Sequence, residues 1–120
     1  MQEYMEKQRI IQELVPGKQI TLAHIIANPD EILYKKLGLD PAVEYSKSAI
    51  GILTVSPAET AIIASDIAIK ASGAQLGFVD RFSGTVIITG TFSEVDASLR
   101  AVTQYAEETL GFTVCKITKT

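Results

Sequence analysis

The sequence contains few of the groups on which catalysis and metal binding usually depend. Among its 120 residues there is one cysteine, Cys115, and one histidine, His24. A single cysteine cannot form an internal disulfide, and these two residues cannot assemble a zinc site from Cys and His alone. His24 lies in an alternating segment with no catalytic motif around it. We therefore expect His24 to be a packed or hydrogen-bonded structural residue and Cys115 to be a small packing residue.

Several patterns with defined functions are missing as well. No segment matches the phosphate-binding loops GxxxxGKS/T or GxGxxG. The net charge of -3 and the lack of any Lys/Arg-rich stretch argue against nucleic acid as a partner. Adjacent carboxylates such as Glu107 and Glu108 point in different directions on a helix, which favours a solvated face over an acid/base pair. We expect no catalytic residues, no cofactor and no metal site.

Long apolar runs are also missing. No run approaches the roughly 18 apolar residues that suggest a membrane span. The N-terminal stretch MQEYMEKQR is polar and mixed in charge, without the apolar region of a signal peptide. These features predict a cytoplasmic protein with no membrane partner.

What is present is typical of a globular protein. Hydrophobic residues make up 47% and charged residues 21% of the chain, and 120 residues fit one domain. We expect an N-terminal arm over residues 1–17 and a single globular domain over residues 18–120.

Periodicity and turn signals predict the order of strands and helices. The expected elements are a short strand Ile10–Val15, a strand Lys18–Ala27, a helix Asp30–Leu37, a strand Ala49–Val55, a helix from Pro57 to about Ser72, strands Gln75–Val79 and Thr85–Phe92, a helix from Ser93 to Gly111, and a strand Phe112–Thr118. From Ala49 onward the order is βαββαβ, which is an α+β, ferredoxin-like pattern of two helices on one face of an antiparallel sheet. Both Phe112–Thr118 and Ala23–Ile26 are expected to be strands of the same sheet, and the order of these two strands in the sheet stays open.

Two helix starts are assigned from capping residues. Asn28 is a good N-cap, and Pro29 suits the first position of the helix that follows. Ser93 with Asp96 resembles a capping box, although Asp replaces the usual Glu or Gln.

The predicted helix from Pro57 to Ser72 has an unusual composition. Its long polar residues Glu59, Asp66 and Lys70 fall on one narrow strip, and Ala and Ile occupy almost every other position. Such a helix is either covered on two sides within one domain or covered partly by a neighbouring subunit, and a chain of this size favours the neighbouring subunit. The helix therefore predicts an oligomer.

Three stretches carry a resemblance to a known family: RIIQELVPGKQITLAHIIANP, AIGILTVSPAETAIIASDIAIKA and LGFVDRFSGTVIITG. They resemble the circularly permuted shell proteins (BMC domain) of bacterial microcompartments for ethanolamine, propanediol and choline utilisation. The segment Leu22–Leu33 looks like the closing strand and helix of unpermuted shell proteins, yet here it precedes Ala49–Val55. This displacement is what a circular permutation produces.

The resemblance implies a structural and non-enzymatic protein. It implies a cyclic homohexamer that tiles edge to edge with other shell proteins, so that the shell encloses enzymes and a reactive aldehyde in the cytoplasm. At the sixfold axis it implies a pore loop made of Asp80, Arg81, Phe82, Ser83 and Gly84. Independently, a tip containing Ser and Gly suits close approach of backbones, because Gly has no Cβ. The alternative is a hairpin turn with no further role.

The N-terminal segment has a counterpart in the permuted family, where six short strands form a small parallel β-barrel over the pore. By resemblance that strand consists of Ile10, Ile11, Gln12, Glu13, Leu14 and Val15. An isolated strand needs hydrogen-bond partners, and symmetry copies in a closed barrel provide them. A flexible arm is the alternative.

Two residues are expected at the hexamer edge. Lys70 matches the lysine through which neighbouring hexamers of the ordinary family meet, but it also suits an i,i+4 ion pair with Asp66. Asn28 stands where many ordinary shell proteins carry an arginine.

Two other functions remain as alternatives at this point. A ferredoxin-like small-molecule-binding regulatory domain would share the βαββαβ order. An enzyme with carboxylate chemistry is the other.

Overall fold

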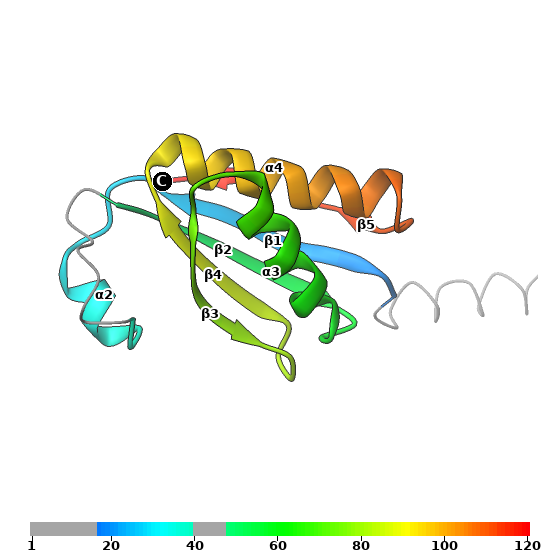
Figure 1. The fold of residues 1–120 in the computed structure, drawn as a ribbon. Helices are drawn as coiled ribbons and strands as arrows, with labels where there is room; N and C mark the ends of the chain where they lie inside the picture. The colour runs from blue at the N-terminus through cyan, green and yellow to red at the C-terminus, as the bar shows by residue number, and fades with distance from the viewer. Residues whose placement is uncertain (1–16, 40–47) are drawn as a thin grey trace, which may run out of the picture.

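The computed structural model describes residues 17–39 and 48–120, which form one mixed β-sheet with three helices (Figure 1). Helices α3 and α4 lie side by side on one face of the sheet, and the short helix α2 packs near one end of the other face. The elements are β1 Gln19–Ile26, α2 Ile32–Lys36, β2 Ala49–Ser56, α3 Thr60–Ala71, β3 Gln75–Asp80, β4 Thr85–Gly90, α4 Phe92–Glu108, β5 Thr113–Val114 and β6 Thr118–Lys119. The predicted strand Ile10–Val15 lies outside the described residues.

The sheet has the strand order β3-β4-β2-β1-β5, and β6 also pairs with β1. The predicted βαββαβ order from Ala49 onward is confirmed, and the pairs β1–β2, β2–β4 and β3–β4 are antiparallel. However, β5 and β6 run parallel to β1, so the sheet is mixed and not wholly antiparallel. The strand order left open by the sequence is thereby settled, because β1 lies between β2 and the C-terminal segment.

The C-terminal segment is two short strands and not the one continuous strand predicted over Phe112–Thr118. Pairing with β1 is interrupted between β5 and β6, where the alternation of the sequence is imperfect. Beyond the interruption, His24 of β1 holds the segment with both ring nitrogens. Its Nδ1 lies 2.6 Å from Thr118 Oγ1 and its Nε2 lies 3.0 Å from Thr120 Oγ1. The prediction of a hydrogen-bonded structural histidine is confirmed.

The main core lies between the sheet and helices α3 and α4. The predicted apolar stripe of α4 is confirmed: Val95, Leu99, Val102 and Ala106 are buried, and Leu110 packs against them. The predicted alternation of β1 is wrong in part, because the pairing register shifts between Ile20 and Leu22. This irregularity acts as a β-bulge, which inserts an extra residue and reverses the faces beyond it. The helix-facing residues of β1 are therefore Ile20, Ala23 and Ile25, all buried.

A second, smaller core lies on the other face of the sheet. Tyr34 of α2 and Leu39 after it bury Ile50 and Ile87. The Tyr34 hydroxyl donates a hydrogen bond of 2.7 Å to the Ser48 carbonyl oxygen. Desolvation, followed by the nearby Glu31 charge, raises the pKa of Tyr34 above its ordinary value. This cluster covers only one end of the face, and no other helix of the described residues packs on the rest of it.

Helix α2 starts later than predicted. It begins at Ile32, and Asn28 is not its N-cap. The side-chain oxygen Oδ1 of Asp30 accepts from the Ile32 backbone N–H at 3.1 Å instead. Gly38, with φ of 70°, ends the helix as predicted.

Helix α3 also starts later, at Thr60 and not at Pro57. Thr60 N–H bonds to the Pro57 carbonyl and Ala61 N–H to the Ala58 carbonyl, each at 3.0 Å. These i→i+3 bonds form tight turns before the α-helix, a common arrangement at helix ends.

The N-terminus of α4 is capped by different residues from those predicted. Thr91 is the N-cap, and its Oγ1 accepts from the Glu94 N–H at 3.1 Å. Glu94 Oε1 accepts from the Thr91 N–H at 2.9 Å, which completes a capping box. The predicted pair of Ser93 and Asp96 is wrong because β4 ends at Gly90, two residues earlier than expected.

Candidate assembly surfaces

The β3–β4 hairpin ends in a tightly hydrogen-bonded loop, Asp80–Gly84. Asp80 Oδ1 accepts from the Phe82 backbone N–H at 2.9 Å, and the Asp80 carbonyl accepts from the Gly84 N–H at 2.8 Å. The Phe82 N–H, and then the Ser83 side chain, lower the pKa of the Asp80 carboxyl below its ordinary value. The turn is therefore held by a charged carboxylate at neutral pH.

Gly84 anchors this loop to the neighbouring strand. Its carbonyl accepts from the Val55 N–H of β2 at 2.9 Å, and its φ is 78°, in the left-handed region. A Cβ at this position would overlap the Val55 carbonyl oxygen. Only glycine satisfies both the backbone angle and the close approach.

The tip of the loop presents an aromatic ring and a cation. The Phe82 side chain is 82% exposed, and the Arg81 guanidinium carbon lies 5.0 Å from the centre of its ring. This distance is within the range of a cation–π contact. A large apolar ring this exposed makes the loop a candidate contact surface when it lies beside other exposed apolar side chains.

Exposed apolar side chains continue from this loop along the edge of the sheet. We call them the edge patch, and its members are Ile62, Ile69, Leu76, Val79 and Phe82. Ile62 is 54% exposed and lines a hollow of about 370 Å³ with Val79 and the first three loop residues. Leu76 and Val79 pair with buried residues of β4, so they lie on the helix side of β3. The patch therefore lies on the side of the outermost strand that faces α3.

The composition of α3 explains why the patch is there. The face of α3 toward the core carries small side chains, Ala61, Ala64, Ser65 and Ala68, all buried. The small residues allow close packing, and Ser98 Oγ of α4 donates to the Ala68 carbonyl at 2.6 Å. Ile62, Ile63 and Ile69 are exposed on its other sides, whereas Ile67 packs against the core. The exposed isoleucines agree with the sequence prediction that this helix needs further cover.

The two ends of the sheet carry different predicted site residues. Gln19 pairs with Ser56, and Thr54 pairs with Thr85, so the start of β1 and the loop lie at one end. At the other end Ile26 pairs with Ile50, which pairs with Thr89. The described chain thus enters the sheet at the end that carries Asp80–Gly84.

Lys70 and Asn28 lie toward the opposite end. Lys70 is in the last turn of α3, shortly before Gln75, which pairs with Thr89. Lys70 Nζ lies 2.8 Å from Asp66 Oδ2, which confirms the i,i+4 ion pair, and its side chain is 75% exposed. Asn28 is exposed in the bend after β1. The surface ion pair between Lys70 and Asp66 contributes little stability, so Lys70 can leave it for another partner.

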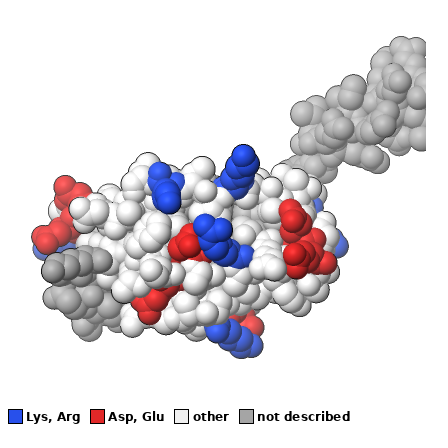
Figure 2. Space-filling view, turned by 90° about the horizontal axis from the view of Figure 1, so that it is seen from above, with Lys and Arg blue, Asp and Glu red and all other residues white. Residues whose placement is uncertain are grey.

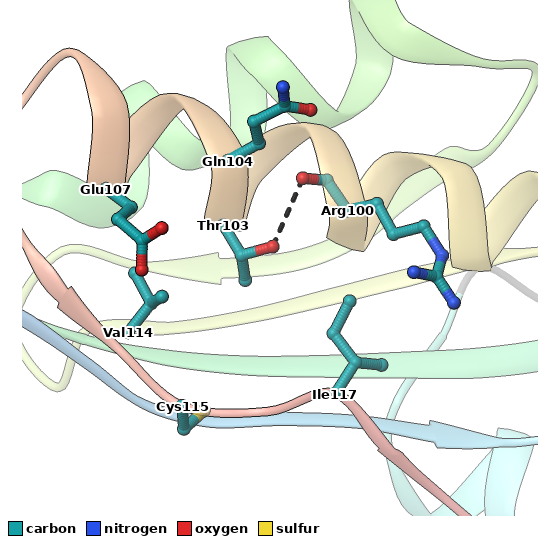
Figure 3. A pocket seen from close by; sticks show the side chains of 7 residues that line it. All are labelled: Arg100, Thr103, Gln104, Glu107, Val114, Cys115 and Ile117. Carbon is teal, nitrogen blue, oxygen red and sulfur yellow. Dashed lines mark hydrogen bonds between the residues drawn. The ribbon is translucent and has the colours of Figure 1, made fainter.

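A groove between α4 and the C-terminal segment has no counterpart in the sequence predictions (Figure 3). It measures about 280 Å³ and is lined by Arg100, Thr103, Gln104, Glu107, Val114, Cys115 and Ile117. Arg100 is paired with Asp96 at 2.9 Å, and this hydrogen bond raises the pKa of Arg100. The only sequence signal for the groove is the imperfect alternation of polar and apolar residues within Phe112–Thr118, where the pairing is interrupted between β5 and β6. We call this feature the C-terminal groove.

No metal-binding cluster is evident in residues 17–39 and 48–120. Within those ranges no three His, Cys, Asp or Glu side chains are grouped so that they could hold a metal ion. No helix in the same ranges is long and apolar enough to cross a bilayer. On the face shown in Figure 2, Lys and Arg side chains are interspersed with Asp and Glu and form no continuous basic stripe.

Comparison with known proteins identifies the family of the chain. The family model of the BMC domain matches residues 49–118. The chain belongs to the BMC domain family. The bacterial microcompartment shell protein PduU of Salmonella typhimurium (strain LT2) is 54% identical over 120 residues, which cover 97% of this chain and 100% of PduU. The predicted resemblance to microcompartment shell proteins is confirmed.

Solved structures of the BMC domain family agree with this assignment. The chain is similar to a CutR flat hexamer, with a TM-score of 0.81, 46% identity, and coverage of 88% of this chain and 94% of that chain. It is also similar to a CutR screw, with a TM-score of 0.77, 46% identity, and coverage of 88% and 100%. The BMC domain match begins only at residue 49, whereas β1 lies inside the sheet, which is the arrangement that a permutation predicts. The alternative of a small-molecule-binding regulatory domain receives no support from these comparisons.

Replacing Gly84 by alanine tests the anchoring of the loop. We expect Gly84→Ala to lower the free energy of unfolding by roughly 3 kcal/mol, because left-handed strain of about 1–2 kcal/mol adds to the overlap with the Val55 carbonyl. Gly38→Ala is the matched control, since Gly38 has φ of 70° but nothing within 4 Å of a Cβ. It should lose only the strain, about 1–2 kcal/mol. Equal losses in urea denaturation at one protein concentration would show that Gly84 is not under packing constraint.

Proposed function

We propose that this chain is a non-enzymatic tile of a microcompartment shell, and that six copies form a cyclic ring that joins other shell proteins around enclosed enzymes. The observation that carries the proposal is the edge patch, whose large apolar side chains are exposed along one side of a member of the BMC domain family. Exposed apolar surface of this kind marks a contact between proteins. A second copy of the chain supplies cover for α3, the role that its nearly all-apolar sequence requires.

The loop Asp80–Gly84 is the pore loop in this proposal. Support comes from the anchoring of Gly84, which fixes the loop backbone, and from Phe82, whose exposed ring gains cover when six loops meet. Because the Asp80 carboxylate is held by its own turn, the carboxylates are kept in a defined orientation around the axis. Arg81 beside them reduces the mutual repulsion of six carboxylates.

The N-terminal arm, residues 1–17, is proposed as a cap over this pore, with Ile10–Val15 as its barrel strand. The support within the described residues is the point where the chain enters the sheet. Gln19 of β1 lies at the same end as the loop, so the arm leaves the domain beside the axis. The division into an arm and a domain over residues 18–120 stays a prediction.

Lys70 and Asn28 are proposed at the rim, where one ring meets the next. Their position at the end of the sheet away from the pore loop supports this role. Lys70 is 75% exposed, so leaving Asp66 for a neighbouring ring costs little.

The edge patch can be tested through Ile62. We expect the wild-type chain to show six times its 13.0 kDa mass in light scattering, and Ile62→Glu to shift it to monomers, because each contact would bury an unpaired carboxylate. Ile32→Glu is the matched control, since Ile32 is 51% exposed but lies on α2, away from the patch. A stable wild-type monomer would overturn the proposed function.

Deleting residues 1–17 tests the cap. The deletion should leave a hexamer, because the edge patch is untouched, and should remove density above the axis in electron-microscopic reconstructions. Dissociation of the ring would instead make the arm an assembly element.

Lys70→Ala tests the rim. We expect this change to reduce edge-to-edge sheets seen by electron microscopy while the ring remains. Asp66→Ala is the control, because it removes the same ion pair but leaves the lysine free for a neighbour. If both variants reduce sheets equally, the ion pair matters and the rim role of Lys70 is wrong.

A further inference from the structure

Two serine side chains join the end of α3 to the first turns of α4. Ser98 of α4 is fully buried, and its Oγ donates to the Ala68 carbonyl of α3 at 2.6 Å. The Oγ of Ser72, just after α3, lies 2.8 Å from Ser98 Oγ and 2.9 Å from the Glu94 carbonyl oxygen. It also accepts from the Ala74 N–H at 3.1 Å. We call Ser72 and Ser98 the serine pair.

Lys70 lies between the two positions that the serine pair holds. It comes two residues after Ala68 and two before Ser72. Because each residue of an α-helix turns by about 100°, Lys70 points about 200° away from Ala68, to the opposite side of the helix. This agrees with the exposure of its side chain, which is 75%. A rotation of the last turn of α3 therefore changes the direction of Lys70, and the bond from Ser98 to Ala68 opposes that rotation.

We propose that Ser98 and Ser72 are positioning residues for the rim contact, because they fix the last turn of α3 so that Lys70 faces the neighbouring ring in one direction. The inference rests on the proposed rim role of Lys70. The lysine makes the contact, and the serine pair acts only through it. A side chain whose backbone is already held in place loses less freedom on binding, so the contact is tighter.

Burial makes the serine pair suitable for this role. A buried hydroxyl or carbonyl that loses its partner carries the full cost of having left water, so such bonds are rarely broken. The exposed ion pair between Lys70 and Asp66 cannot replace them, since both residues belong to α3 and turn together with the helix. The orientation of the last turn relative to α4 therefore depends on the serine pair.

The turn after α3 also packs closely against the start of α4. A Cβ on Gly73 would overlap the Glu94 carboxylate, whose Oε1 accepts from the Thr91 N–H in the capping box. The Glu94 side chain thus lies directly against the backbone of the turn, which has little space to move toward α4. The end of α3, the turn and the start of α4 behave as one block beneath Lys70.

Sheet assembly tests the proposal, measured as the lowest protein concentration at which electron microscopy shows edge-to-edge sheets. We expect Ser98→Ala to raise this concentration at least about threefold, because Lys70 then has to be ordered on binding. Ser65→Ala is the matched control. Ser65 is also buried, but its Oγ donates to the Ala61 carbonyl of its own helix. The control should leave the concentration unchanged.

A double variant shows whether Ser98 acts through Lys70. In a Lys70→Ala background, Ser98→Ala should cause no further loss of sheets, because the side chain that it positions is gone. A general loosening of the fold would add its own effect in both backgrounds. A further rise in the concentration needed for sheets therefore overturns the positioning role.

Hydrogen exchange measured by mass spectrometry locates the effect within the ring. In Ser98→Ala, amides of residues 68–74 should exchange roughly fivefold faster, while those of β1 and β2 keep the wild-type rate. Equal acceleration in the sheet indicates a loss of overall stability and counts against the proposal.

Ser72 keeps the test decisive if Ser98→Ala fails to form rings, since Ser72 is only partly buried. Ser72→Ala should impair sheets. Ser72→Thr should preserve them, because it keeps the hydroxyl and suits the extended backbone at this position, with φ of -156°. Equal behaviour of the two Ser72 variants overturns the role of the hydroxyl.

Light scattering of the same samples separates the possible failures. Rings whose sheets are impaired by Lys70→Ala, but by neither alanine variant of the serine pair, overturn the positioning role and leave the proposed function intact. Wild-type rings that form no sheets, or sheets that survive Lys70→Ala, overturn the rim role and this inference with it. A wild-type monomer overturns the proposed function itself.

Discussion

Strand β1 is hydrogen-bonded on both sides, to β2 along most of its length and to the C-terminal segment on its other edge. The C-terminal segment is too short and too interrupted to form a stable edge alone, because its two strands have only two residues each. Its attachment therefore depends on β1, through the backbone bonds of Thr113 and Thr120 and the two hydrogen bonds of His24. The same pairing sets the end of the sheet at which the chain enters, and so the proposed place of the arm beside the pore loop.

The sequence was sufficient for the order of the elements, the apolar stripe of α4 and the need of α3 for a second cover, because periodicity reports which faces are buried. The sequence was not sufficient where two nearby residues could each take the same structural role. Thr91 and Ser93 are both good capping residues, and the choice depends on where β4 ends. The bulge near Leu22 could not be predicted from hydrophobic alternation, because apolar residues occupy both faces of β1. Leu22 and Ile26 continue the predicted pattern, although the shifted register turns Ala23 and Ile25 toward the helices.

Some of the candidate surfaces could likewise be predicted from the sequence, and one could not. The loop and the exposed apolar helix were predictable, because turn residues and helix periodicity are local. The C-terminal groove was not, since its walls come from α4 and from a segment whose placement depends on β1, nearly one hundred residues away along the chain. His24 shows the same limit: its two threonine partners are 94 and 96 residues distant in sequence.

Neighbouring copies in the proposed ring meet head to tail, and this has a consequence for the whole assembly. Such a head-to-tail contact does not itself count subunits, because each added copy offers a fresh open surface. Six copies close only if each contact turns by one sixth of a circle without a rise along the axis. A small axial step at the same contact would replace closure by an endless spiral. The geometry of a single contact therefore decides between a finite tile and a filament.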